Sequence, residues 1–290
     1  MSVQQLAEEI ENLIVSLTDD FAEGVDSIQG RLYNRLVAVI KDLELDDEGY
    51  IKQSAANRRI LYDAENLINE YLPGESLPKI VSNAVLGINE IDSANERYFS
   101  DVSGKFNPNR NYIKGLQQQT IQKIEQNILQ DGLTVQIKTP LVDILNRNVN
   151  SGGSFYGFLQ EIRNFITGNE DIDGRLFSYS RTYLRDTLFQ YHRSYQQSIT
   201  KDLKLEFYMW AGGTMDKSRE FCIEHSGNFY HHREIEKFSK QNWRGKIPGT
   251  TESSIFTLAG GYNCTHSIIP VSEVIVPEDV IERNRKVGNI

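Results

Sequence analysis

Residues 204–232 read KLEFYMWAGGTMDKSREFCIEHSGNFYHH, and residues 260–271 read GGYNCTHSIIPV. These two stretches hold both cysteines of the chain and four of its five histidines. Uniform scatter would rarely place six of seven such side chains so close together, so the sequence indicates one local site near its C-terminal end. The six side chains are Cys222, His225, His231, His232, Cys264 and His266.

Two pairs within these stretches have a spacing suited to chelation. Cys222 and His225 are three residues apart, which places both on one face of a helical turn. Cys264 and His266 are two apart, which places both on one face of a strand. A thiolate and an imidazole from each of two elements make a four-coordinate set that zinc favours. The alternative is a small core with two buried thiols and hydrogen-bonded histidines and no metal.

Alternating side chains over residues 205–210 predict a strand that opens a small α+β domain over residues 204–276. Asp216 is expected to cap the short helix that presents Cys222. A second strand is expected over residues 262–270. If the two strands are neighbours in one sheet, the two cysteines come close together. The polar tail, residues 277–290, is expected to extend away from this domain.

Upstream, the sequence predicts an elongated, multi-helix body over residues 1–203, so the fold class is mainly α with a small C-terminal α+β domain. Its clearest element covers residues 3–44, where apolar side chains recur every three to four positions in one stripe. The loop at residues 100–109 is a candidate subdomain boundary. Further helices are expected over 51–72, 78–96, 108–131, 140–149, 155–166 and 175–203, with a short strand or extended connector over 133–137.

The net charge of −9 is unevenly distributed. Residues 1–102 contain 20 acidic and 8 basic side chains, so this part is a poor binder of duplex DNA and is better suited to a protein partner. The helix expected over 175–203 combines arginines with aromatic residues, and Arg181, Arg185 and Arg193 are candidate phosphate contacts. The alternative is that its aromatic residues are buried while the arginines reach solvent.

Several other functions find no support in the sequence. The acidic N-terminal residues do not resemble a signal peptide, no apolar run reaches the length of a membrane span, and two cysteines suit a reducing cytoplasm. Phosphate-loop, nucleophile-elbow and H-E-x-x-H motifs are missing from the sequence. A non-enzymatic protein is therefore expected. The alternatives are a metal-dependent enzyme acting on nucleic acid through Cys222, His231 and His232, or a DNA-binding module using the 175–204 helix.

Two blocks of residues within the C-terminal stretches resemble the phage Mu F-like head morphogenesis domain. The resemblance covers about the last quarter of the chain, and the family often has a second cysteine at the position of His225 and Cys-Arg-Cys where this chain has Cys264-Thr265-His266. The first block comprises Trp210, Asp216, Ser218, Arg219, Cys222 and Gly227, and the second comprises Gly260, Gly261, Tyr262, Asn263, Cys264, His266 and Pro270.

This resemblance implies a minor head protein of a tailed phage. Members of the family associate with the portal and are carried inside the capsid, with no enzymatic role that the motif explains. The expected partners are therefore the portal protein, other capsid or scaffolding proteins and packaged double-stranded DNA. The protein is expected to be made in the host cytoplasm and to reside in the virion.

Overall fold

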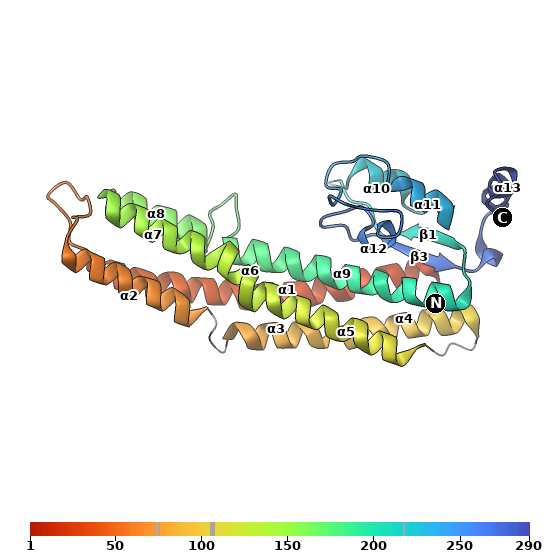
Figure 1. The fold of residues 1–290 in the computed structure, drawn as a ribbon, viewed down its shortest axis with the longest axis horizontal. Helices are drawn as coiled ribbons and strands as arrows, with labels where there is room; N and C mark the ends of the chain where they lie inside the picture. Colours follow the sequence, from red (N-terminus) through yellow and green to blue (C-terminus); the bar gives the residue numbers. More distant parts are fainter. Residues whose placement is uncertain (73, 75, 105–107, 217) are drawn as a thin grey trace. The chain divides into compact units, whose positions relative to one another are not determined.

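The computed structural model describes residues 1–72, 74, 76–104, 108–216 and 218–290. These residues are mainly helical and include one three-stranded antiparallel sheet in the C-terminal part of the chain, which confirms the predicted fold class (Figure 1). Within the described ranges, no helix has both the length and the apolar character needed to cross a membrane.

The chain folds into two compact units built from segments that alternate along the sequence. Unit 1 comprises residues 1–17, 86–120 and 185–290, and unit 2 comprises residues 18–85 and 121–184. The helical residues expected to form one N-terminal body are therefore divided between both units. The C-terminal α+β residues share their unit with helical segments that are distant in sequence.

Unit 2 is entirely helical apart from short loops and isolated bridges in its described residues. Residues 18–40 of α1 (Val3–Ile40) belong to this unit and bury their share of the apolar stripe, and the helix continues through both of its glycines. Helix α2 (Ala55–Tyr71) begins later than expected because the Ser54 hydroxyl accepts a hydrogen bond from the Asn57 amide, the usual arrangement at a helix start. Further helices of this unit include α3 (Ser76–Leu86), α7 (Thr139–Ser151) and α8 (Phe155–Ile166).

The strand considered for residues 133–137 is absent, and the chain is helical there. The α-helical turn α6 (Asp131–Leu133) lies between two π-helical segments, η1 (Gln126–Gln130) and η2 (Thr134–Lys138). Leu133 and Ile137 are buried and Val135 is exposed, which suits two residues four apart on one helix face. Three apolar residues at alternate positions cannot distinguish this arrangement from a strand.

The single helix expected over residues 78–96 is instead two helices, α3 and α4 (Ile88–Ser103), separated by Gly87. A Cβ atom on Gly87 would lie 2.3 Å from Cδ1 of Leu17, so only glycine allows this approach to α1. The boundary expected at 100–109 is described only in part. Helix α4 ends at Ser103, α5 (Arg110–Glu125) follows, and residues 105–107 lie outside the described residues.

The sheet of unit 1 has the strand order β2-β1-β3, with β1 (Phe207–Ala211) antiparallel to both β2 (Phe229–His231) and β3 (Ser267–Val271). The first and last strands are therefore neighbours in one sheet, which is the condition under which the two cysteines were expected to come close, whereas β2 was not predicted. The expectation that the tail extends away is wrong. Its residues form α13 (Glu278–Lys286), which buries Val280 and Ile281 because they lie on one face of the helix.

Candidate functional site

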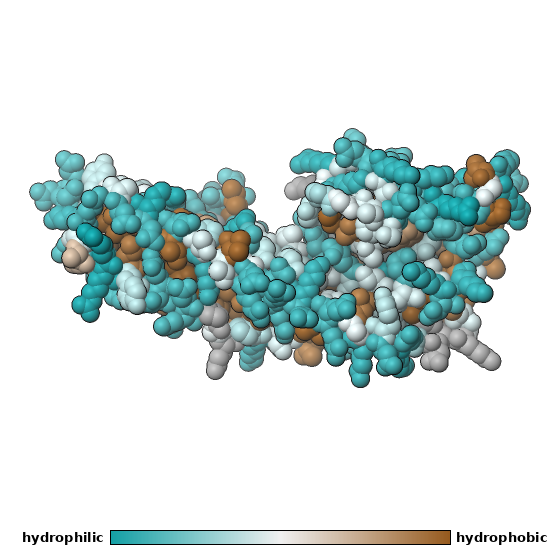
Figure 2. All heavy atoms as spheres, viewed as in Figure 1, coloured by the Kyte–Doolittle hydropathy of each residue, from teal (hydrophilic) through white to brown (hydrophobic). Residues whose placement is uncertain are grey.

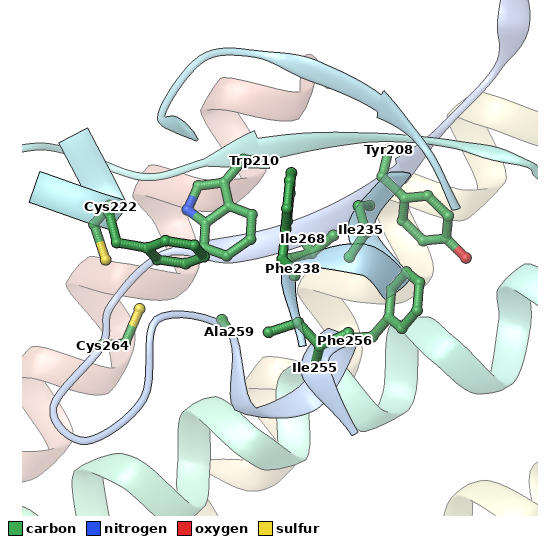
Figure 3. Close-up of a cluster of buried hydrophobic side chains, with 11 residues drawn as sticks. Tyr208, Trp210, Cys222, Ile235, Phe238, Ile255, Phe256, Ala259, Cys264 and Ile268 are labelled. Atoms are coloured by element: carbon green, nitrogen blue, oxygen red, sulfur yellow. The ribbon is translucent and has the colours of Figure 1, made fainter. Parts of the chain in front are cut away.

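An aromatic core fixes the elements that carry the cysteines and His266. Trp210 of β1 is fully buried and contacts Phe221 edge to face, with ring centroids 5.4 Å apart. Phe221 in turn stacks on Trp243, with ring centroids 3.9 Å apart. Because Phe221 precedes Cys222 in α10 (Glu220–His225), this packing holds the helix against the sheet (Figure 3).

The two cysteines approach each other at the edge of this core. Cys222 comes from α10, and Cys264 lies in the turn that follows α12 (Ile255–Leu258). Figure 3 shows their sulfur atoms facing one another. The two sulfurs and a ring nitrogen of His266 lie within 4.8 Å of one another, and all three residues are buried. The predicted proximity of the cysteines is therefore confirmed.

Glycine makes this approach possible. A Cβ atom on Gly260 would lie 2.4 Å from Sγ of Cys222 and 2.9 Å from Sγ of Cys264. Gly212 likewise allows the close approach of His266. Its φ is +134°, and a Cβ atom there would lie 3.0 Å from the His266 Cα. Larger side chains at these two positions would force the three candidate ligands apart.

Arg193 of α9 (Arg175–Leu203) holds the Cys264–His266 segment in place. Its Nη2 donates to the carbonyl oxygens of Cys264 and His266, at 2.6 Å each, and its Nε donates to His266 at 2.9 Å. Its Nη1 donates to the Thr257 carbonyl at 3.1 Å. Arg193 is only 2% exposed, so the positive charge lies in the interior beside the two thiols.

The surroundings of the two thiols shift their pKa values in opposite directions. The hydrogen bond from the Cys222 thiol is the largest influence that lowers the pKa of Cys264, and His266 and Arg193 act in the same direction. The same hydrogen bond, together with burial, raises the pKa of Cys222. Independently of the contact between the two thiols, Arg193 and His266 therefore favour the thiolate form of Cys264.

The residues present fit a zinc ion. Two sulfurs and one imidazole nitrogen are a donor set that zinc favours, and adjacent ligands of a tetrahedral zinc ion lie about 3.3–3.8 Å apart. The three ligand atoms lie within 4.8 Å of one another, so small side-chain rotations can bring them to these distances. Nδ1 of His266 lies 3.9 Å from Sγ of Cys264, and the buried Nε2 has no hydrogen-bond partner in the described part of the chain.

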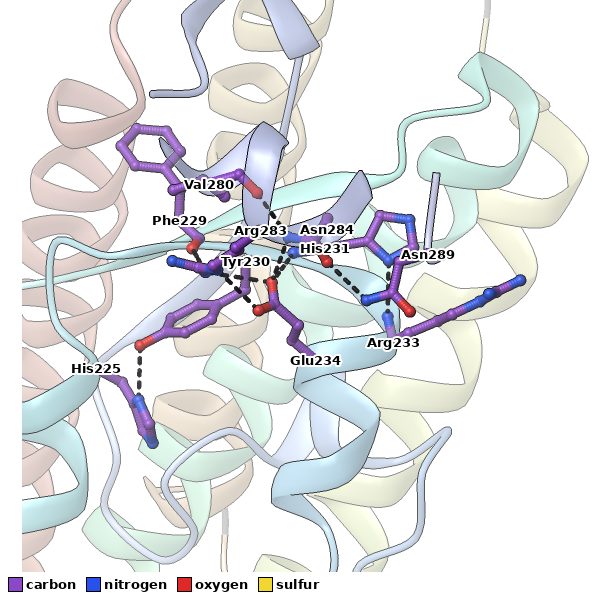
Figure 4. A network of polar contacts seen from close by, with 10 residues as sticks. All are labelled: His225, Phe229, Tyr230, His231, Arg233, Glu234, Val280, Arg283, Asn284 and Asn289. Carbon is purple, nitrogen blue, oxygen red and sulfur yellow. Dashed lines mark hydrogen bonds and ion pairs between the residues drawn. The ribbon is translucent and has the colours of Figure 1, made fainter. Parts of the chain in front are cut away.

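His225, the fourth ligand expected, is not in this group. Its Nδ1 lies 2.8 Å from the Tyr230 hydroxyl (Figure 4). Its ring also stacks on Phe238, with ring centroids 4.2 Å apart. The helical spacing from Cys222 is as predicted. However, the aromatic core surrounds the histidine ring and holds it away from the thiols, which leaves three candidate ligands from the predicted four.

The expectation that Cys264 and His266 lie on a strand is also wrong, because β3 begins at Ser267. Both side chains nevertheless point inward, since Arg193 binds the two carbonyl groups. Asp216 does not cap α10 as expected. The N-cap residue is Arg219, and no side-chain hydrogen bond closes that end of the helix.

A pocket of about 1180 Å³ opens beside the three candidate ligands, and Cys222, Cys264 and His266 all line it. Part of each block of the family resemblance lines it, namely Asp216, Ser218, Arg219 and Cys222 of the first block and Asn263, Cys264 and His266 of the second. The Arg219 guanidinium donates to the Tyr262 carbonyl and so joins the two motif blocks. The other lining residues with polar side chains include Arg185, Glu220, Glu224, Arg244 and Thr265.

Three motif residues, Gly227, Gly261 and Asn263, lie in turns. Gly227 has a φ of +80°, and its amide donates to the Trp210 carbonyl at 2.8 Å. A Cβ atom on Gly261 would lie 2.0 Å from the Gly245 carbonyl oxygen. Asn263, with a φ of +56°, donates its amide to Oδ1 of Asp186 at 2.9 Å. At these three positions the local backbone geometry therefore explains the residue type.

The three arginines proposed as DNA contacts do not form a free cationic surface. Arg193 is buried and already bonded to carbonyl groups, so its prediction as a phosphate contact is wrong. Arg181 forms an ion pair with Asp19 at 2.7 Å. Arg185 lines the pocket near the cysteines and is only partly exposed. The position of Arg193 could not be predicted, because the sequence around it gives no sign of the turn that it binds.

Comparison with family models, with curated proteins and with solved structures finds no match for this chain.

Proposed function

We propose that this protein is a structural, non-enzymatic minor head protein of a tailed phage, which docks at or near the portal on the interior of the capsid. The observation that carries the proposal is that residues from both blocks of the Mu F-like resemblance line one pocket. Arg219 of the first block binds the Tyr262 carbonyl of the second. Residues that meet in one folded site are better support for a family relationship than a match in sequence order alone.

In this proposal, the protein acts in head assembly by binding other proteins through its surface. The strongly acidic first third of the chain suits binding to the portal or to other capsid and scaffolding proteins. Packaged DNA remains a proposed neighbour, but the three arginines first considered do not supply the contact. Arg193 in particular has its donors occupied by protein carbonyl groups.

A zinc ion held by Cys222, Cys264 and His266 is part of the proposal. When bound, it would link α10 to the turn after α12 and so stabilise a domain with a small sheet. Two other residues position the three candidate ligands. Gly260 leaves room for the two sulfurs, and Arg193 fixes the backbone of the Cys264–His266 segment.

The experiment is quantitative mass spectrometry of purified virions, with the ratio of this chain to the portal protein as the measurement. We expect a fixed ratio in intact heads. The variant Cys222→Ser should lower incorporation if the folded C-terminal domain is needed, whereas Lys286→Ala, at an exposed site of the C-terminal helix, serves as the control. Absence of the chain from virions and from head precursors would overturn the proposal.

A second candidate is a metal-dependent enzyme that acts on nucleic acid. The favouring observation is that only three candidate ligands meet beside an open pocket, and three protein ligands with one open position are typical of catalytic zinc sites. Hydrolysis of DNA or RNA that is lost on chelation and in Cys264→Ser, and restored by added zinc, would support it. Virion incorporation without hydrolysis supports the structural role.

A further inference from the structure

A second group of candidate metal ligands lies where β1 pairs with β2. In the antiparallel pairing of β1 with β2, Phe207 is opposite His231. This register places Glu206, just before β1, beside His232, the first residue of α11 (His232–Phe238). The His232 amide accordingly donates to the Glu206 carbonyl at 2.9 Å. Strand pairing thus brings a carboxylate to two histidines.

The three side chains converge. A carboxylate oxygen of Glu206 and one ring nitrogen each from His231 and His232 lie within 4.8 Å of one another. Adjacent nitrogen and oxygen ligands of a tetrahedral zinc ion are about 3.3 Å apart. Since Glu206 is exposed and His232 is half-buried, rotations of their side chains can close this difference.

The ring of His231 is fixed in position and has a ring nitrogen without a hydrogen-bond partner among the described residues. His231 is fully buried, its ring contacts Phe207 edge to face at 5.4 Å, and its Nε2 has no hydrogen-bond partner among the residues that the structure describes. An imidazole nitrogen without another partner is the ligand atom that zinc takes from histidine.

A polar network fixes the backbone of His231 (Figure 4). The Glu234 carboxylate accepts hydrogen bonds from the His231 amide at 2.9 Å and from Asn284 at 3.0 Å. The same carboxylate forms an ion pair with Arg283 at 2.9 Å. Both Arg283 and Asn284 belong to the C-terminal helix, so this helix orients the strand end from which His231 projects. Supporting contacts of this kind commonly orient metal ligands.

We infer that Glu206, His231 and His232 form a zinc site, distinct from the cysteine cluster, that leaves one coordination position open. Two imidazoles and one carboxylate are an established ligand set for zinc with an open position. Glu206 and His232 also line a pocket of about 710 Å³, so an ion held there would be accessible to a small ligand. The inference does not depend on the proposed role in the phage head.

The experiment titrates the full-length protein, in reducing buffer, with Co²⁺ as a spectroscopic substitute for zinc. Thiolate-bound Co²⁺ gives a charge-transfer band that nitrogen and oxygen ligands do not, so the two sites are read separately. We expect one ion without the thiolate band. His232→Ala should weaken its binding at least about tenfold. Glu206→Gln, at an exposed position, should also weaken it and is not expected to disturb folding.

Glu236→Gln is the matched control, because Glu236 lines the same pocket but is not one of the three ligands. It should leave the affinity unchanged. The inference is overturned if the wild-type protein binds no ion beyond a thiolate-bound one. It is also overturned if the ion persists in both His232→Ala and Glu206→Gln, or is lost only in Cys222→Ser and therefore belongs to the cysteine cluster.

Discussion

Replacing Arg193 by methionine tests whether this buried side chain holds the Cys264–His266 segment. The change keeps an apolar stem and removes every guanidinium donor. The carbonyl oxygens of Cys264 and His266 then lose their partner in the interior, at a cost of about 1–3 kcal/mol for each. The desolvation cost of a buried cation disappears with the charge, which offsets part of this loss. We expect the free energy of unfolding to fall by about 2–4 kcal/mol.

Urea unfolding followed by tryptophan fluorescence is a suitable assay. The chain has two tryptophans, and both Trp210 and Trp243 belong to the aromatic core beside the cysteines. Arg185→Met is the matched control on the same helix. The Arg185 Nε has no hydrogen-bond partner in the described ranges, so this change should alter stability by at most about 0.5 kcal/mol. Equal destabilisation by the two variants would refute the reasoning.

Three further predictions concern other parts of the chain. Gly260→Ala should lower the free energy of unfolding by about 1–3 kcal/mol and weaken metal binding, because the new methyl group meets both sulfurs. Gly115→Ala, in helix α5 and with no atom within 4 Å of the added Cβ, should stabilise the protein by about 0.5–1 kcal/mol, and the opposite signs are the check. Burial raises the pKa of Asp92 to about 6 from 3.8, so the stability that its protonated form contributes is full below pH 3.8 and is lost as the pH rises through 6. The free energy of unfolding of Asp92→Asn should therefore exceed that of the wild type above pH 7, by up to about 3 kcal/mol, and should be similar to it near pH 4. Urea titrations at these pH values measure both free energies, and a difference between the variants that does not change with pH would contradict this prediction. Deleting residues 277–290 should cost at least about 3 kcal/mol, because Val280 and Ile281 lose their buried contacts; an unchanged urea midpoint would show that the C-terminal helix contributes little.

Local periodicity in the sequence predicted much of the secondary structure. The stripe of α1, the helices near residues 155–166 and 175–203 and the first strand follow from side-chain spacing, because one face of each element must be apolar. The clustering of cysteine and histidine also located the candidate site. Both signals act over a few residues and do not depend on distant partners.

Only the tertiary structure decided which side chains meet. His225 and His266 have equally good spacing from their cysteines, but aromatic packing directs the first toward Tyr230 while Arg193 holds the segment that directs the second toward the thiols. Arg193 itself looked like a surface cation and proved to be an internal donor. The sequence determines the chemistry and local periodicity of each side chain. Which side chains become neighbours depends on contacts between distant segments, such as those of residues 193 and 266. No local pattern in the sequence records these contacts, because buried polar groups find distant partners only when the chain has folded.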